Sequence, residues 1–184
     1  MASVYQARLE NTIKIIVHAV SASIALVVGI TQISMRFRAK YPKTNSILQN
    51  INFTSVIFGS ISGFALAFIA QGGMPNLFGF STLAIVWLYS CLMAMKSIHN
   101  KDMPNFRIWI IRNYMLTSTA INLRILLGLW VWDHGPDTIP IFYQALGYLT
   151  WVPTFIITEW FILNDSPFAT KLQPHFSQFF KRSF

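Results

Sequence analysis

The sequence contains few charged residues: 11% of its 184 residues are Asp, Glu, Lys or Arg, whereas 54% are hydrophobic. An average soluble domain has about 25% charged residues. A chain of this length leaves room for one domain, and a globule of that size would lack the polar residues needed to cover its apolar ones. The composition therefore excludes an ordinary soluble fold and predicts that lipid surrounds most of the protein.

The sequence is also poor in the residues that bind metals or carry out catalysis. Cys91 is the only cysteine, which excludes an intrachain disulfide and a Cys-x-x-Cys site. Among the four histidines, only His18 lies within an apolar run. The sequence contains no nucleophile–base arrangement, phosphate-binding loop or dinucleotide fingerprint. We therefore predict no metal site and no soluble-enzyme chemistry.

Basic residues outnumber acidic ones, which gives a net charge of +8. A nucleic-acid-binding protein would gather such residues in a stripe on one face. Here they lie in the gaps between apolar runs, which is the pattern of membrane topology. Nucleic acid is therefore not an expected partner, whereas membrane lipids are.

What the sequence does contain is five apolar runs, each long enough or nearly so to cross about 30 Å of hydrocarbon. We predict an all-α, polytopic membrane protein, a five-transmembrane-helix bundle that forms a single domain over residues 1–184. The predicted helices cover residues 12–34, 51–71, 77–95, 106–132 and 139–163. Residues 165–184 mix phenylalanine with basic residues and are predicted to be an interfacial or a disordered cytoplasmic tail.

The loops differ in charge, and this difference predicts the orientation. The second loop has no basic residue, and the fourth carries Asp133 and Asp137. The first loop, the third loop and the tail are basic, with Arg36, Arg38, Lys40, Lys43, Lys96, Lys101, Arg107, Lys171, Lys181 and Arg182. Because basic loops stay in the cytoplasm, we predict that the N-terminus lies outside and the C-terminus inside.

Small and polar residues mark the helix faces that we expect to pack, because lipid gives helices no hydrophobic reason to associate. In the second helix Ser55, Gly59, Gly63 and Ala67 recur every four residues, which predicts a surface for close helix packing. Pro153 predicts a kink in the fifth helix. Three helices each carry a narrow face with polar residues: His18, Ala22, Ala25, Gly29 and Gln32; Asn113, Thr117, Ala120 and Arg124; and Gln144, Tyr148, Trp151 and Phe155.

Arg124 is the most informative of these residues. It lies eight residues from the outer end of its predicted helix, about 12 Å deep, and an arginine at the bilayer centre costs roughly 2.5–3.5 kcal/mol. No carboxylate occurs at that depth in the sequence. The alternatives are that Arg124 reaches outward to the interface or binds hydroxyl and carbonyl groups as a structural contact. We predict a buried site for an oxygen-bearing or anionic ligand, lined by His18, Arg124, Tyr148, Gln144, Thr117 and Asn113.

Arg112 and Glu159 form a second predicted pair. They lie at matching depths, close to the cytoplasmic ends of two neighbouring antiparallel helices. Because buried charges are usually paired, we predict a structural ion pair between them. A proton-relay role for Glu159 is the alternative.

Several short motifs follow one another in a fixed order between His18 and about Gly128. They are His18 with Gly29 and Gln32, Gly63-Phe64-Ala65-Leu66-Ala67 with Gly72-Gly73, Gly79-Phe80, Trp87-Leu88, Trp109, Arg112-Asn113-Tyr114, Leu116-Thr117 and Leu123-Arg124. In order and spacing they resemble an uncharacterised family of bacterial predicted membrane proteins, the domain of unknown function 2306. This family usually has two further histidines at cytoplasmic helix starts, where this sequence has Asn45 and Phe106. The resemblance implies the topology and a bacterial inner membrane, but no activity.

These observations lead to three functional hypotheses. The first is a non-catalytic accessory subunit of a larger membrane complex, which packs against other transmembrane subunits and holds a lipid or quinone-like molecule near His18, Arg124 and Tyr148. The second is a membrane oxidoreductase that uses haem b or a quinone, for which His18 and His134 could approach from the same side. The third is a small transporter, although five helices without an internal repeat are not typical of that class.

Overall fold

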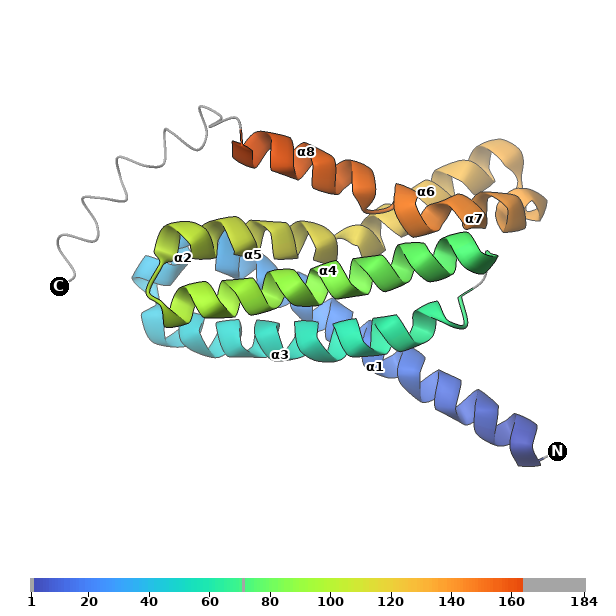
Figure 1. Cartoon of the computed structure of the whole chain (residues 1–184), viewed down its shortest axis with the longest axis horizontal. Helices are drawn as coiled ribbons and strands as arrows, with labels where there is room; N and C mark the ends of the chain where they lie inside the picture. Colours follow the sequence, from blue (N-terminus) through green and yellow to red (C-terminus); the bar gives the residue numbers. More distant parts are fainter. Residues whose placement is uncertain (1, 71, 164–184) are drawn as a thin grey trace.

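The computed structural model describes residues 2–70 and 72–163, which are almost entirely helical (Figure 1). Five stretches of this part of the chain are long and apolar enough to cross a membrane: Asn11–Ile33, Pro42–Ala67, Gly73–His99, Met103–His134 and Phe142–Ile162. The predicted all-α fold with five transmembrane spans is therefore confirmed. The predicted tail, residues 165–184, lies outside the described residues.

The helices differ from the predicted ones mainly in where they begin and where they break. The second span begins at Pro42 rather than near residue 51, and the fourth and fifth spans each consist of two helices. The elements are α1 (Ala2–Ile33), α2 (Met35–Lys40), α3 (Pro42–Ala67), α4 (Gly73–His99), α5 (Met103–Thr117), α6 (Thr119–His134), the short 3-10 helix η1 (Pro136–Thr138), α7 (Ile139–Leu149) and α8 (Val152–Leu163).

Local sequence signals set several of the helix boundaries. The Ser34 hydroxyl accepts a hydrogen bond from the Phe37 amide at 3.3 Å and so caps α2, and Pro42 occupies the first turn of α3, where its missing N–H is harmless. Gly72 precedes α4 with φ +98°, a conformation that favours glycine. The Asp102 carboxylate accepts from the Asn105 amide at 3.1 Å and caps α5.

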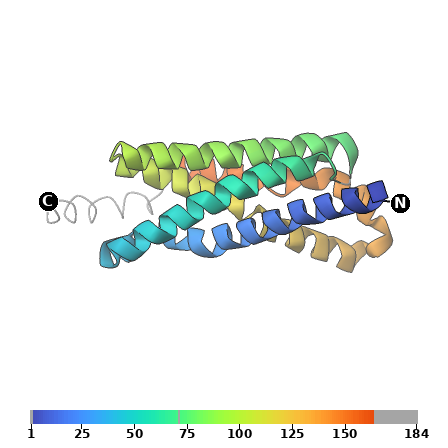
Figure 2. The same ribbon diagram turned by 90° about the horizontal axis from the view of Figure 1, so that it is seen from below.

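The four helices α1, α3, α4 and α5 form the packed centre of the molecule (Figures 1 and 2), with α3 lying against both α1 and α4. Close packing depends on the small-residue stripe Ser55, Gly59, Gly63 and Ala67. A Cβ atom at Gly59 would lie 2.8 Å from the Trp87 ring of α4, and one at Gly63 would lie 2.9 Å from the His18 ring of α1. The buried apolar cluster that these helices share consists of Ala25, Phe53, Val56, Trp87, Cys91, Ala94, Phe106, Ile110 and Leu116, with Trp151 added from the fifth span.

The fourth span is broken at Ser118, which corrects the prediction of one continuous helix. The hydroxyls of Thr117 and Ser118 donate to the carbonyl oxygens of Asn113 (2.8 Å) and Met115 (2.7 Å) in the preceding turn. Such back-bonding by Ser and Thr bends helices. The axis of α6 therefore departs from that of α5 (Figure 1), and the predicted face from Asn113 to Arg124 is not continuous.

The fifth span is broken at residues 150 and 151, just before Pro153, the residue that predicted a kink. Its first part, α7, is tied closely to α4. The Asn76 side chain donates to the Tyr143 carbonyl oxygen at 2.6 Å and accepts from the Gly147 amide at 2.8 Å. A Cβ atom at Gly79 would lie 2.5 Å from the Gly147 backbone, so these two glycines let the helices touch.

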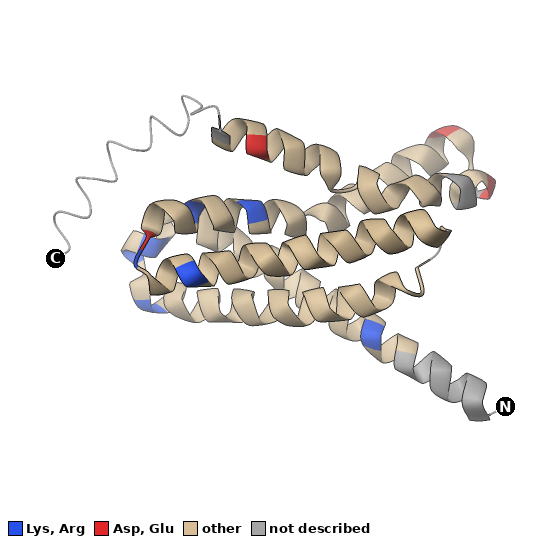
Figure 3. Cartoon of the chain, in the orientation of Figure 1, with Lys and Arg blue, Asp and Glu red and all other residues tan. Residues whose placement is uncertain are grey.

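The two ends of the molecule differ in charge (Figure 3). Arg36, Arg38, Lys40, Lys43, Lys96 and Lys101 gather where α2 and the α4–α5 loop lie, which we call the basic end. Asp133 and Asp137 lie at the opposite end, near η1, which we call the acidic end. This separation is the charge asymmetry that the positive-inside rule uses.

Candidate functional site

The structure does not bring the predicted ligand site together. His18 Nδ1 donates to the Gly59 carbonyl oxygen at 2.9 Å, so this ring faces α3. Arg124 is exposed on α6, where its guanidinium donates to the Ala120 carbonyl oxygen of its own helix at 3.1 Å. Gln144 and Tyr148 are exposed on α7. The predicted convergence on Arg124 required an unbroken fourth helix, and the break at Ser118 removes that condition.

Two of the predicted residues, Asn113 and Thr117, belong instead to a buried network between α4 and α5. Trp87 Nε1 donates to the Thr117 hydroxyl at 2.9 Å, and the Asn113 side-chain amide donates to the Ser90 hydroxyl at 2.9 Å and to the Trp87 carbonyl oxygen at 3.2 Å. Satisfied buried networks of this kind hold elements in one arrangement. These contacts join the two helices at mid-span.

Arg112 and Glu159 form a bidentate ion pair between α5 and α8. The Arg112 Nε and Nη2 atoms lie 2.5 and 2.6 Å from the two Glu159 carboxylate oxygens. Both side chains are only about one-fifth exposed (18% and 22%), and the guanidinium lies 4.5 Å from the centre of the Trp109 ring. The two residues that the sequence analysis paired are therefore in direct contact.

A groove of about 510 Å³ adjoins this ion pair and separates α8 from α4 and α5. Its lining consists of Val86, Tyr89 and Ser90 from α4, Trp109 and Arg112 from α5, and Phe155 and Glu159 from α8. Most of the lining is apolar, and the charged groups lie at one place in it. An amphipathic molecule fits such a lining, because ligand sites combine apolar walls with a few placed polar groups.

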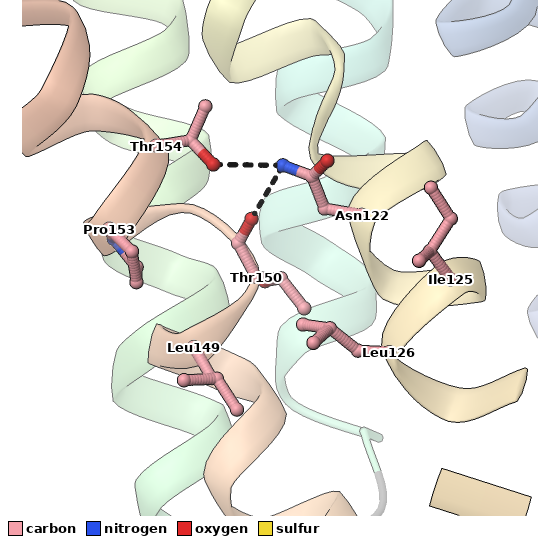
Figure 4. Close-up of a pocket in the computed structure, with 7 residues that line it drawn as sticks. All are labelled: Asn122, Ile125, Leu126, Leu149, Thr150, Pro153 and Thr154. Carbon is pink, nitrogen blue, oxygen red and sulfur yellow. Dashed lines mark hydrogen bonds between the residues drawn. The ribbon is translucent and has the colours of Figure 1, made fainter. Parts of the chain in front are cut away.

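A second, smaller pocket of about 370 Å³ lies at the break between α7 and α8 (Figure 4). Asn122 reaches across it from α6 and donates to the Thr150 carbonyl oxygen at 3.1 Å and to the Thr154 hydroxyl at 3.0 Å. The break frees backbone groups, and Asn122 satisfies one of them. The remaining lining is mostly apolar: Ile125, Leu126, Leu149 and Pro153.

A cluster of buried polar residues near the basic end, which we call the amide cluster, was not predicted from the sequence. Gln32, Asn45, Gln49 and Asn52 are each less than one-tenth exposed. Arg38 Nη2 donates to Gln49 Oε1 at 2.9 Å, and the pKa of Arg38 is lowered by its burial. The spacing of four and then three residues from Asn45 to Asn52 was the available signal. It was overlooked because Asn45 and Gln49 precede residue 51, where this helix was predicted to begin.

Four atoms of this amide cluster are buried without a hydrogen-bond partner: Gln32 Oε1, Arg38 Nε, Asn45 Oδ1 and Asn52 Nδ2. A buried polar atom left unpaired costs about 1–3 kcal/mol. Two of the four are donors and two are acceptors, which suits bound water molecules that bridge them.

Comparison with known proteins gives one match. Residues 15–162 match the family described as Predicted membrane protein (DUF2306). The chain belongs to this family. No curated protein and no solved structure matches this chain.

The positions where the DUF2306 resemblance places two further histidines both lie at the amide cluster. The Arg38 guanidinium lies over the Phe106 ring, with its Cζ atom 4.3 Å from the ring centre. Asn45 lies one turn before Gln49 on α3. His18 is bonded to Gly59, fourteen residues further along α3, which corresponds to about 21 Å. In this DUF2306 member the three positions are therefore too far apart to coordinate one metal ion. Among the described residues, no three His, Cys, Asp or Glu side chains are grouped to hold a metal ion.

Proposed function

We propose that this protein is a non-catalytic accessory subunit of a membrane complex and that it holds a lipid or quinone-like molecule in the groove between α4, α5 and α8. The observation that supports this proposal is the groove itself, which is apolar except at the Arg112–Glu159 ion pair. It replaces the site first predicted around His18, Arg124 and Tyr148. A binding role is favoured because the groove-lining side chains include no nucleophile–base pair.

The ion pair favours a head group that is neutral and carries oxygen atoms. Glu159 already neutralises Arg112, so an additional anion would leave an excess negative charge in the membrane. The pair uses Nε and Nη2 of Arg112, and Nη1 can therefore donate to a carbonyl or hydroxyl oxygen of a ligand. Trp109, Tyr89 and Phe155 would contact the apolar remainder of the molecule. A quinone-like ring with an isoprenoid chain has this combination of groups.

Titration of the purified protein with decylubiquinone tests the proposal, because a quinone bound beside Trp109 quenches its fluorescence. Val86→Phe fills the groove, whereas Ile85→Phe places the same ring on the exposed side of α4, where Ile85 is 57% exposed. We expect Val86→Phe to weaken binding about tenfold or more, equivalent to about 1.4 kcal/mol, and Ile85→Phe to leave it unchanged.

Equal quenching in both variants, or none in the unaltered protein, would contradict a quinone-like ligand in this groove. Phe155→Trp fills the groove from α8 and replaces Val86→Phe if that variant does not fold. Mass spectrometry of the solvent extract from gently purified protein tests the lipid form of the proposal. A Soret band in the same preparation would favour the haem-dependent oxidoreductase instead.

We further propose that the basic end is cytoplasmic and that the membrane is the bacterial inner membrane. The separation of Lys and Arg from Asp133 and Asp137 supports this orientation (Figure 3). Green fluorescent protein fused to the C-terminus should then fluoresce, since it does not mature after export, whereas alkaline phosphatase fused there should be inactive. The reverse result would invert the topology.

A further inference from the structure

Arg124 carries a positive charge on the surface of α6, within the span Met103–His134. It lies ten residues before the end of α6 at His134, a distance of about 15 Å along the helix. Its guanidinium is exposed, and the hydrogen bond that it donates goes to the Ala120 carbonyl oxygen of its own helix. A carbonyl oxygen does not neutralise the charge, so the cost of placing arginine in lipid remains.

No carboxylate of residues 2–70 and 72–163 lies at the depth of Arg124. Glu159 is bound to Arg112, Asp102 caps α5 at the basic end, and Asp133 and Asp137 lie in the last turn of α6 and in η1, at the acidic end. The other two acidic residues of the sequence are at positions 10 and 165, beyond the ends of the first and fifth spans. A second copy of the chain offers the same set, so pairing between copies would place arginine against apolar residues.

The surface around Arg124 is open along the length of α6. One side of α6, through Asn122, Leu126 and Trp130, meets α7, α8 and η1. The opposite side, which we call the outer face of α6, consists of Ile121, Arg124, Gly128 and Trp132. A Cβ atom at Gly128 would have no neighbour within 4 Å, and Trp132 is 86% exposed.

We propose that the outer face of α6 binds a transmembrane helix of a partner protein, and that this helix places a carboxylate opposite Arg124. Charge complementarity specifies the carboxylate. Gly128, one turn further along the face, allows the two helix backbones to approach closely, as small residues do at interfaces within membranes. This inference rests on the proposed role as an accessory subunit and specifies the chemistry of the partner, but it does not depend on the ligand groove.

Co-reconstitution with model transmembrane peptides tests the proposal. The full chain is placed in phosphatidylcholine vesicles at pH 8 with a Leu/Ala-rich peptide that carries one Glu at the depth of Arg124 and a dansyl group at its end. Energy transfer from the protein's tryptophans reports binding. We expect this peptide to bind about tenfold more tightly than the peptide with Gln at the same position, a difference of about 1.4 kcal/mol.

Matched variants decide whether Arg124 causes the preference. Arg124→Gln should remove it, and Arg124→Glu should transfer it to a peptide that carries Lys. Gly128→Leu should weaken binding of the Glu peptide, whereas Gly128→Ala should weaken it less. Equal binding of the Glu and Gln peptides to the unaltered protein would overturn the proposal, as expected if Arg124 instead reaches a lipid phosphate. Quinone binding in the groove should be the same in the Arg124 variants, so the two proposals fail separately.

Discussion

Helices α3 and α6 both lie within membrane spans, yet their surroundings are opposite. Ten residues of α3 are buried, and its glycines Gly59 and Gly63 touch side chains of α4 and α1. In α6 the buried residue is Thr119, and the space beside Gly128 is open. The contrast teaches that a glycine within an apolar span does not by itself identify a packed helix. A glycine identifies a packed helix only where a neighbouring helix fills the space beside it.

Substitutions at Gly59 and Gly128 test this contrast most strongly, because we expect their effects on stability to differ most. Gly59→Leu should destabilise the protein by about 3 kcal/mol or more, because the new side chain meets the Trp87 ring and overpacks the centre. Gly128→Leu should change stability by less than about 0.5 kcal/mol. Unfolding by SDS in mixed micelles, followed by circular dichroism, measures both. Similar losses in the two variants would show that α6 is packed as tightly as α3.

Substitution of Arg112, which contacts a neighbouring helix, should destabilise the protein more than substitution of Arg124, which does not. Arg112→Gln should cost about 1–3 kcal/mol, because Glu159 then loses its partner in a mostly buried place. Arg124→Gln should leave the isolated chain as stable as before or more so, because it removes an unpaired charge from the span. The same unfolding assay distinguishes them. In the double variant Arg112→Gln/Glu159→Gln, much of the loss should be recovered.

The spans were predictable because apolar runs report directly on the thickness of the membrane. The ion pair was predictable because Arg112 and Glu159 lie at equal depth in adjacent antiparallel helices, and each lacks another partner nearby. Neither inference needs knowledge of how the helices turn about their axes.

The helix breaks and the tertiary contacts were less accessible. The Thr117-Ser118-Thr119 sequence is compatible with a continuous helix, and hydroxyls that bond backward also occur in the unbroken helices α3 and α4. Asn76 lies just before residue 77, where the third helix was predicted to begin, whereas its side chain joins α4 to α7. The predicted site around Arg124 does not form because the helix breaks at Ser118, and a helix face continues only as far as the helix does.

Two buried asparagines provide a smaller test, this time within the packed centre. Asn113→Leu should cost about 1–3 kcal/mol, because it removes the two buried hydrogen bonds that the Asn113 amide donates to the Ser90 hydroxyl and the Trp87 carbonyl oxygen. Asn52→Leu should cost less or be neutral, because no protein group accepts a hydrogen bond from the Nδ2 atom that it removes. A larger loss for Asn52→Leu would indicate that bound water satisfies the amide cluster fully. Thermal unfolding in detergent is sensitive enough to rank the two.

The smallest expected effect concerns the basic end, outside the membrane. Hydrogen bonds from the Asn105 side chain and backbone lower the pKa of Asp102. A carboxyl whose pKa is lowered by folding stabilises the fold above its unfolded pKa, and this stabilisation disappears as the pH falls through the folded pKa. The melting temperature should therefore decline slightly on acidification below about pH 4. In Asp102→Ala this part of the decline should be absent, and an unchanged pH profile would exclude a capping contribution.

Oxygen accessibility of a spin label at Gly128 tests most directly whether α6 lacks a partner within the chain. With Cys91 replaced by serine, labels at Gly128→Cys on the outer face of α6 and at Val56→Cys in the packed centre are compared by power saturation in a bilayer. We expect the label at position 128, where a Cβ atom has no neighbour within 4 Å, to be as accessible as one at the lipid-facing Ile85, and the label at position 56 to be protected. Protection of position 128 in the isolated, monomeric chain would contradict an open α6 and remove the basis for a partner helix there.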